Sequence, residues 1–136
     1  MSSITTTETT TSQDAANEYS VAFVTTPNEE SAKTLARSVV EGKLAACVSV
    51  LPGLVSFYTW EDKLNESSEC LLMIKTRTAL VNSLIQFVVE KHEYDVPEVI
   101  TLPITTGNPA YLDWIGKCVP NPGLPVKSKQ NDTSKE

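Results

Sequence analysis

Two extended apolar segments in the middle of the chain limit the folds that it can adopt. Residues 46–60 form the first segment, which is interrupted only by Pro52-Gly53, and residues 70–75 form the second. A proline and a glycine inside a strand-like run are typical of a β-bulge, so we expect one long, bent strand rather than two. The polar residues 61–69 are predicted to form the reversal, which makes the two segments the arms of a long β-hairpin.

The hairpin is flanked on each side by one strand and one helix. Residues 21–25 and 99–104 are short apolar runs of strand type, and Pro103 places the second run at a sheet edge. Thr26-Pro27-Asn28-Glu29 fits a capping box that starts the first helix with Thr26 as its cap. The second helix is expected to start near Thr76 or Thr78. Apolar residues then recur at helical spacing in both halves: Ala32, Leu35, Ala36, Val39 and Val40, and later Val81, Leu84, Ile85 and Val88.

This order predicts an α+β, ferredoxin-like fold of the type βαββαβ, with a long central hairpin. Asn108-Pro109 opens a short C-terminal helix. Both longer helices should cover one face of a four-stranded antiparallel sheet. The hairpin is longer than its neighbouring strands and carries Phe57, Tyr58 and Trp60. An apolar ribbon with free edges aggregates unless a partner covers it, so we expect self-association through the hairpin.

The chain of 136 residues has room for one domain. We expect an ordered block at residues 20–118 between tails at residues 1–19 and 119–136. The first tail is rich in threonine and serine and the second in proline and polar residues, so neither can bury enough apolar surface to offset its ordering entropy.

Charge and composition exclude several classes of partner. The formal net charge is -6 without a basic stripe, so nucleic acid and membrane surfaces are not expected partners. No apolar run approaches the about 18 residues that span a bilayer. The first residues lack the apolar region of a secretory signal, so the cytoplasm is the expected location. Cys47, Cys70 and Cys118 have no CxxC spacing and are predicted to be reduced thiols.

Several motifs, in order, resemble the CutA divalent-cation tolerance family. PNEESAKTLARSVVEGKLAACVSVLPGLVSFYTWEDKL resembles the first half of these proteins, notably in KLAACV, in the Pro-Gly bend and in the aromatic YxW near the hairpin tip. MIKT, HEYDVPEVITLPI and YLDWI resemble the second half and its end. The similarity spans nearly all of residues 20–118.

The resemblance implies a tight homotrimer whose hairpins exchange sheet contacts, and an architecture similar to that of the PII signalling proteins. Our leading interpretation is a CutA-like binding or scaffold trimer, not an enzyme, in the response to divalent metals and to copper in particular. The alternative is a PII-like sensor that binds a small anionic metabolite in clefts between subunits. An enzyme that uses Tyr94 and Glu98 is the least favoured reading.

His92 is the candidate metal ligand. It is the only histidine, and imidazole suits copper or zinc. The family resemblance implies a copper site of one cysteine and two adjacent histidines, but Val24 and Lys91 stand at two of these three positions. We therefore expect no required cofactor and only weak binding of Cu(II) or another divalent cation at His92. The alternative is a helix-end histidine without a metal.

The candidate ligand cleft comprises Trp60, Tyr58, Lys75, Tyr94 and Glu98. The family pattern H-x-Y-x-x-P-E is present from His92 to Glu98 and implies that Tyr94 and Glu98 are cleft residues. Lys75 with aromatic walls from Tyr58 and Trp60 could hold an anion. Interface packing is the preferred role for these aromatics, and solvated loop charge is the alternative for the carboxylates. No P-loop, GxGxxG or HExxH motif indicates catalysis.

Overall fold

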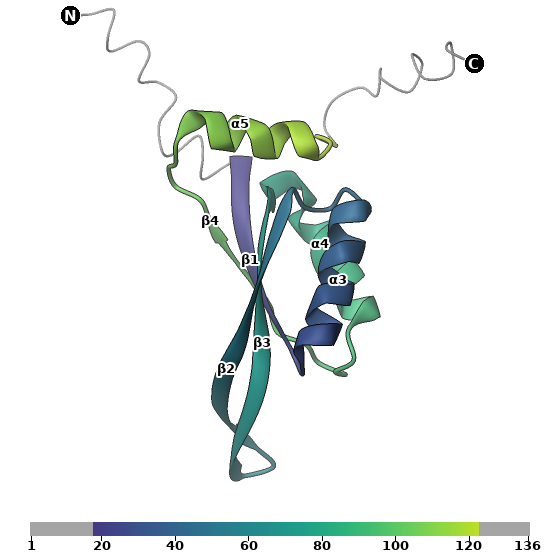
Figure 1. Ribbon diagram of the computed structural model, residues 1–136, viewed down its shortest axis with the longest axis vertical. Coiled ribbons are helices and arrows are strands. Elements are labelled where there is room, and N and C mark those ends of the chain that lie inside the picture. Colours follow the sequence, from purple (N-terminus) through teal and green to yellow (C-terminus); the bar gives the residue numbers. More distant parts are fainter. Residues whose placement is uncertain (1–17, 123–136) are drawn as a thin grey trace, which may run out of the picture.

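The computed structural model describes residues 18–122 and shows one four-stranded antiparallel sheet with strand order β2-β3-β1-β4. Helices α3 and α4 lie on one side of the sheet, and α5 crosses its end (Figure 1). The elements are β1 (Tyr19–Thr26), α3 (Glu29–Glu41), β2 (Cys47–Trp60), β3 (Lys63–Arg77), a 3-10 turn (Thr78–Leu80), α4 (Val81–Lys91), β4 (Val99–Pro103) and α5 (Pro109–Cys118). The predicted ferredoxin-like βαββαβ order and the C-terminal helix are confirmed.

The central hairpin is formed by β2 and β3, which pair from Cys47 opposite Lys75 to Trp60 opposite Lys63. The register shifts between Leu51 and Leu54, where Gly53 has a φ of 84°. The predicted bulge is therefore present, and β2 remains one strand. The hairpin projects well beyond the rest of the sheet (Figure 1).

The reversal of the hairpin is much shorter than predicted. Glu61 and Asp62 have φ values of 53° and 65°, and the polar residues 63–69 belong to β3. Two successive left-handed residues match the twist of the flanking strands and close a tight two-residue turn. The prediction that residues 61–69 are the loop was wrong, because polar residues also suit a strand that faces water on both sides.

The cap of α3 also differs from the prediction. Asn28 is the cap: its Oδ1 accepts a hydrogen bond from the Ser31 amide at 2.8 Å, and Ser31 Oγ accepts one from the Asn28 amide at 3.4 Å. Thr26 is the last residue of β1, and its hydroxyl donates to the Asn28 carbonyl at 2.9 Å. Asn and Thr are both good caps, so the sequence alone did not separate them.

The core lies between the sheet and its two long helices. Alternate residues of the central strands point toward the helices and are buried, and so is one face of each helix. The members of this core include Ala22, Val24, Leu72, Ile74, Leu35, Val39, Leu84 and Val88. Burial of each large apolar side chain contributes roughly 1.5–3 kcal/mol.

The opposite face of the sheet is apolar and largely uncovered. Cross-strand neighbours share a face, so Phe23 lies there beside Met73 on β3 and Ile100 on β4. Ile100 is 56 % exposed and Leu102 is 53 % exposed. We call this surface, formed by Phe23, Met73, Ile100 and Leu102 with their neighbours Val21, Leu51 and Leu71, the open face.

Helix α5 covers only the end of the open face that is formed by Tyr19 and Arg77. Arg77 donates to the Gly116 carbonyl at 2.6 Å and to the Val119 carbonyl at 3.2 Å, and Ile115 is buried. The expected tails fall almost wholly outside residues 18–122, although Tyr19 belongs to β1 and Val119 is buried. The proposed division of the chain into a block and two tails stays a prediction.

Candidate functional site

His92 follows the last residue of α4 and joins this helix to the end of β1. Its Nδ1 accepts a hydrogen bond from the Tyr94 amide at 3.0 Å, which leaves the ring proton on Nε2. Nε2 lies 2.7 Å from the Thr25 carbonyl and donates to it. Both ring nitrogens are therefore engaged, and a metal ion could bind His92 only by replacing one of these hydrogen bonds.

The neighbours of His92 do not complete a metal site. Val24 is fully buried, and Lys91 places its Nζ 5.6 Å from the centroid of the Phe87 ring. Within residues 18–122 there is no group of three or more His, Cys, Asp or Glu side chains that could hold a metal ion. Weak copper binding at His92 stays a prediction.

Tyr94 joins the same segment to the hairpin. Its hydroxyl donates to Glu69 Oε2 at 3.0 Å, and its ring centroid lies 4.8 Å from that of His92. Burial, and then the hydrogen bond to the Glu69 carboxylate, raises the pKa of Tyr94 to about 12. The phenol therefore keeps its proton at neutral pH and acts as a hydrogen-bond donor. Sequence reasoning missed Glu69, because it lies 25 residues before Tyr94 and belongs to no motif.

The aromatic residues of the hairpin occupy two different positions. Tyr58 is close enough to Tyr94 to contribute to its raised pKa, and the Tyr58 hydroxyl lies 2.8 Å from Ser67 Oγ on β3. Trp60 is the last residue of β2 and is 62 % exposed at the tip. The structure thus brings Tyr58, Tyr94 and Glu69 together and leaves Trp60 apart.

Lys75 lies at the other end of the hairpin. Its Nζ donates to Ser49 Oγ at 3.0 Å and contacts Cys47 Sγ at 3.6 Å. The 14-residue β2 spans roughly 40 Å at about 3.3 Å per residue, so Lys75 and Trp60 cannot line one pocket within a subunit. Tyr111 of α5 reaches the same end, and its pKa is raised by burial and by Cys47. Sequence reasoning predicted neither Cys47 nor Tyr111 here.

Glu98, the fifth predicted cleft residue, precedes β4 and is exposed. It makes no hydrogen bond or ion pair within the part of the chain that the structure describes. The structure therefore does not join Glu98 to Tyr94, and the predicted cleft of five residues is not one site in a single subunit. Their role as cleft residues stays a prediction.

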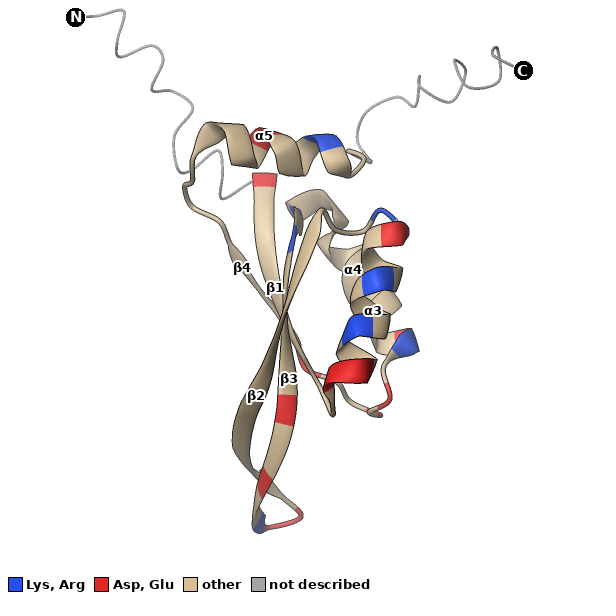
Figure 2. Cartoon of the chain, in the orientation of Figure 1, with Lys and Arg blue, Asp and Glu red and all other residues tan. Residues whose placement is uncertain are grey.

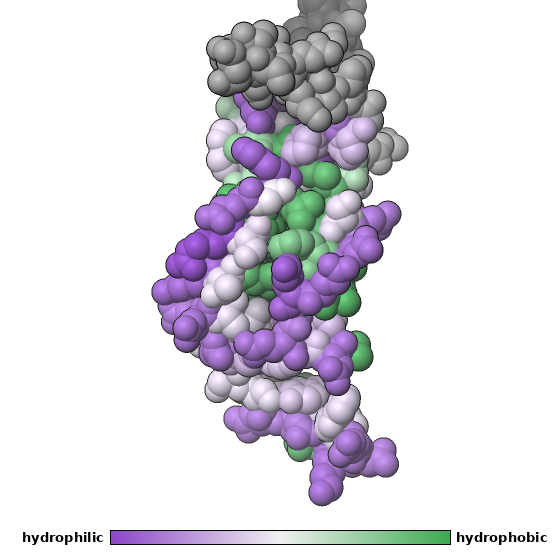
Figure 3. Space-filling view, turned by 90° about the vertical axis from the view of Figure 1, so that its right-hand side faces the viewer, coloured by the Kyte–Doolittle hydropathy of each residue, from purple (hydrophilic) through white to green (hydrophobic). Residues whose placement is uncertain are grey.

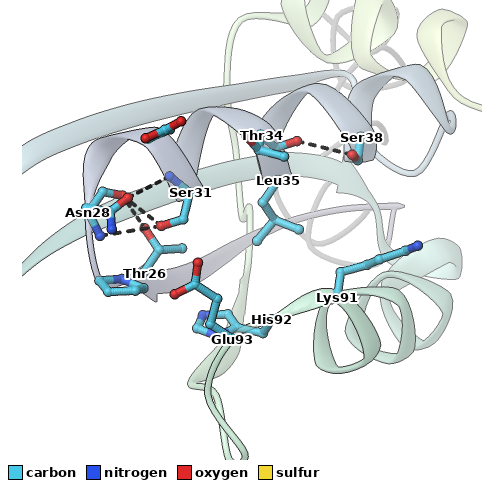
Figure 4. Close-up of a pocket in the computed structure, with 11 residues that line it drawn as sticks. Thr26, Asn28, Ser31, Thr34, Leu35, Ser38, Lys91, His92 and Glu93 are labelled. Atoms are coloured by element: carbon cyan, nitrogen blue, oxygen red, sulfur yellow. Dashed lines mark hydrogen bonds between the residues drawn. The ribbon is translucent and has the colours of Figure 1, made fainter.

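A cavity of about 450 Å³ lies between α3 and the segment that follows α4. Figure 4 shows Leu35 pointing into it from α3, while Lys91, His92 and Glu93 approach from the opposite wall. The sequence reasoning did not predict this cavity. Its only sequence signal is the series Ser31, Thr34 and Ser38, which puts hydroxyls rather than apolar groups along one side of α3.

The described residues contain no helix that is long and apolar enough to cross a membrane. A family model described as CutA1 divalent ion tolerance protein matches residues 20–118. The chain is 54 % identical over 101 residues to the Protein CutA homolog of Xenopus laevis, which covers 74 % of this chain and 67 % of the frog protein. It is 55 % identical over 95 residues to the chloroplastic Protein CutA of Arabidopsis thaliana, with 70 % of this chain and 52 % of the plant protein covered.

Among solved structures, CutA1 from Oryza sativa superposes with a TM-score of 0.75 at 48 % sequence identity. The superposition covers 76 % of this chain and 95 % of the rice chain. The family-model match over residues 20–118 takes in the βαββαβ core, the long hairpin and α5. Family model, sequence and structure agree, and the chain belongs to the CutA1 divalent ion tolerance family.

Proposed function

We propose that this chain is a non-enzymatic binding or scaffold protein in divalent-metal tolerance, and that it works as a homotrimer. The observation that supports the trimer best is the open face. Its apolar residues are half-buried or exposed although they continue the central sheet, and β1 and β4 contain no charged residue. Figure 2 shows most of the charges on the helices and along the hairpin, and where β3 pairs with β1 the charged residues on this face are Lys75, opposite Val21, and Arg77, opposite Tyr19.

The exposed aromatic residues of the hairpin support the same proposal. Phe57 is 63 % exposed and Trp60 is 62 % exposed, on opposite faces of a ribbon with free edges. In a closed ring each ribbon meets the next subunit, and closure keeps the free edges from propagating into a fibre. Burial of one such side chain contributes roughly 1.5–3 kcal/mol, and symmetry repeats the gain at each interface.

A PII-like sensor is the second candidate function. Lys75 lies roughly 40 Å from Trp60 within one subunit, so a cleft that contains both needs two subunits. Such a cleft would bind a small anionic metabolite through Lys75 between aromatic walls. Isothermal titration of the assembled protein with nucleotides tests this candidate, and heat of binding that disappears in Lys75→Met would favour it over the scaffold role.

Direct copper binding is proposed to occur at His92. We expect it to be weak, because both ring nitrogens of His92 already have hydrogen-bond partners. The protein would then contribute to metal tolerance without binding the metal ion tightly itself. We place it in the cytoplasm, although two of its plant relatives are named as chloroplastic. Imaging of a tagged full-length chain tests the location.

Light scattering at micromolar concentration tests the assembly. We expect the mass of three chains for the wild type, and dissociation or joint unfolding for Trp60→Asp on the hairpin and for Ile100→Asp on the open face. Val89→Asp is the matched control, because Val89 is 46 % exposed on the outer side of α4. A stable, monodisperse wild-type monomer would refute the proposed architecture.

A further inference from the structure

The cavity between α3 and the end of α4 belongs to a single subunit and lies on the helix side of the sheet, away from the open face. Its volume of about 450 Å³ is in the range of pockets that hold small metabolites. Viewed from the helix side, the molecule shows an apolar strip between two polar outer surfaces (Figure 3). The lining of the cavity itself is mostly polar, and Leu35 and Pro27 are its apolar members, so it offers a ligand both apolar contact and polar groups.

Opposite charges stand at opposite ends of this cavity. Figure 4 shows the Glu93 carboxylate directed toward Asn28 and Ser31 at the start of α3, whereas Lys91 extends the other way. Leu35 lies between them and is 6 % exposed. Glu93 and Lys91 make no ion pair within residues 18–122. The Lys91 ammonium lies 5.6 Å from the centroid of the Phe87 ring, a contact that leaves its N–H donors for a ligand.

Part of the remaining lining adds hydrogen-bonding capacity, whereas Thr26, Asn28 and Ser31 bond to one another. The Thr34 hydroxyl makes no hydrogen bond inside the described region. The Ser38 hydroxyl donates to the Thr34 carbonyl at 3.1 Å, and its oxygen can still accept a hydrogen bond. Glu30 adds a second carboxylate to the lining. His92 contributes only a wall, because both of its ring nitrogens are engaged.

We propose that this cavity binds a small zwitterion whose ammonium and carboxylate groups are separated by a short apolar chain. The ammonium group pairs with Glu93, the carboxylate pairs with Lys91, and the chain packs on Leu35. A ligand with a single charge would satisfy one end and leave the other unpaired. The site needs neither the trimer nor a metal ion.

Nuclear magnetic resonance titration of the full chain with β-alanine, γ-aminobutyrate and ε-aminocaproate tests the proposal. We expect saturable shifts at Leu35, Thr34 and the residues after α4 with at least one of these ω-amino acids. Caproate and hexylamine, which each lack one charge, should bind about tenfold more weakly, since each loses one charge-assisted hydrogen bond. If either binds as tightly as the best zwitterion, or if no probe shifts the cavity residues, the proposal is wrong.

Charge variants distinguish the cavity from a general surface effect. Lys91→Met and Glu93→Gln should each weaken binding of the best zwitterion about tenfold. Lys33→Met is the matched control, because Lys33 lies on α3 outside the cavity and pairs with Glu29 at 3.1 Å. Both cavity positions are exposed, so we expect all three variants to fold. Unchanged affinity in Lys91→Met, or an equal loss in Lys33→Met, would overturn the assignment.

Discussion

The side chains of His92 and Tyr94 fasten one short segment to two different strands. His92 donates to the Thr25 carbonyl at the end of β1, and Tyr94 donates to Glu69 on β3. The two residues also bond to each other, through the Tyr94 amide and His92 Nδ1. The segment after α4 is thus attached at two points and stiffened by one bond of its own, and His92 is part of one wall of the cavity.

The raised pKa of Tyr94 predicts a loss of stability at high pH. Tyrosine in the unfolded chain releases its proton near pH 10.0, whereas folded Tyr94 holds it to about 12. Its contribution to the free energy of unfolding is therefore complete below pH 10.0 and is lost as the pH rises through 12. In Tyr94→Phe, the free energy of unfolding should therefore fall less between pH 10.0 and about 12 than in the wild type. Denaturant unfolding at a series of pH values in this range measures the difference.

Burial is the main cause of this shift, so Glu69→Gln should reduce the decline only partly. The remaining decline should include Tyr19 and Tyr111, because burial raises the pKa of both. A Tyr94→Phe variant with the full wild-type slope would contradict the assignment to Tyr94.

Copper titration of the wild type and of His92→Ala tests the metal hypothesis at the same residue. We expect weak binding that the substitution abolishes, because Val24 and Lys91 cannot supply the other ligands. His92→Ala also removes the bond to Thr25, so circular dichroism must confirm that the variant is folded. Tight binding that survives the substitution would place the metal elsewhere, with the thiols of Cys47 and Cys118 as the first positions to test.

At the scale of single elements, the long hairpin depends on one glycine. Gly53 has a φ of 84°, and a methyl group added there would meet no atom within 4 Å. Gly53→Ala should therefore cost about 1–2 kcal/mol through backbone conformation alone. Urea unfolding at a fixed protein concentration measures the loss.

Gly107→Ala is the control for this substitution. Gly107 has an ordinary φ, and its added methyl group would only touch Leu112 at 3.5 Å. We expect a change within about 0.5 kcal/mol there. Equal losses at both glycines would mean that the bulge does not require a left-handed residue.

The sequence predicted those elements whose pattern is local. Apolar spacing located both long helices, and Pro52-Gly53 indicated the bulge, because each signal lies within a few residues. Residues 63–69 were predicted to be a loop because they are polar. They form a strand of the projecting hairpin, which has no buried side and therefore lacks the apolar alternation that indicates a strand. Contacts between distant segments, such as Glu69 with Tyr94 or Cys47 with Tyr111, depend on the register of the whole sheet and left no local signal.

At the scale of the whole molecule, the sheet has two unlike faces. One face carries α3 and α4 and holds the core, while the open face carries only α5 at one end. The hairpin adds exposed apolar side chains on both of its sides. Family resemblance, the open face and the hairpin all favour self-association, and the oligomeric state stays a prediction until it is measured.

Deletion of residues 1–17 and 123–136 should leave the melting temperature nearly unchanged, because their composition offers little apolar surface to bury. Deletion of residues 1–19 and 119–136 removes Tyr19 from β1 and the buried Val119. That larger deletion should lower the melting temperature by several degrees. Differential scanning calorimetry of both variants measures the difference, and a large drop in the shorter deletion would show that a tail packs on the domain.

The position of β1 in the sheet has a consequence for how the protein is made. Among the strands that the structure describes, β1 is the first to leave the ribosome, yet it lies between β3 and β4 and pairs with both. During synthesis it must wait for Arg77 at the end of one partner and for Pro103 at the end of the other. The nascent chain therefore cannot complete its sheet until residue 103 has emerged, and until then at least the β4-side edge of β1 is open to mispairing or to capture by a chaperone.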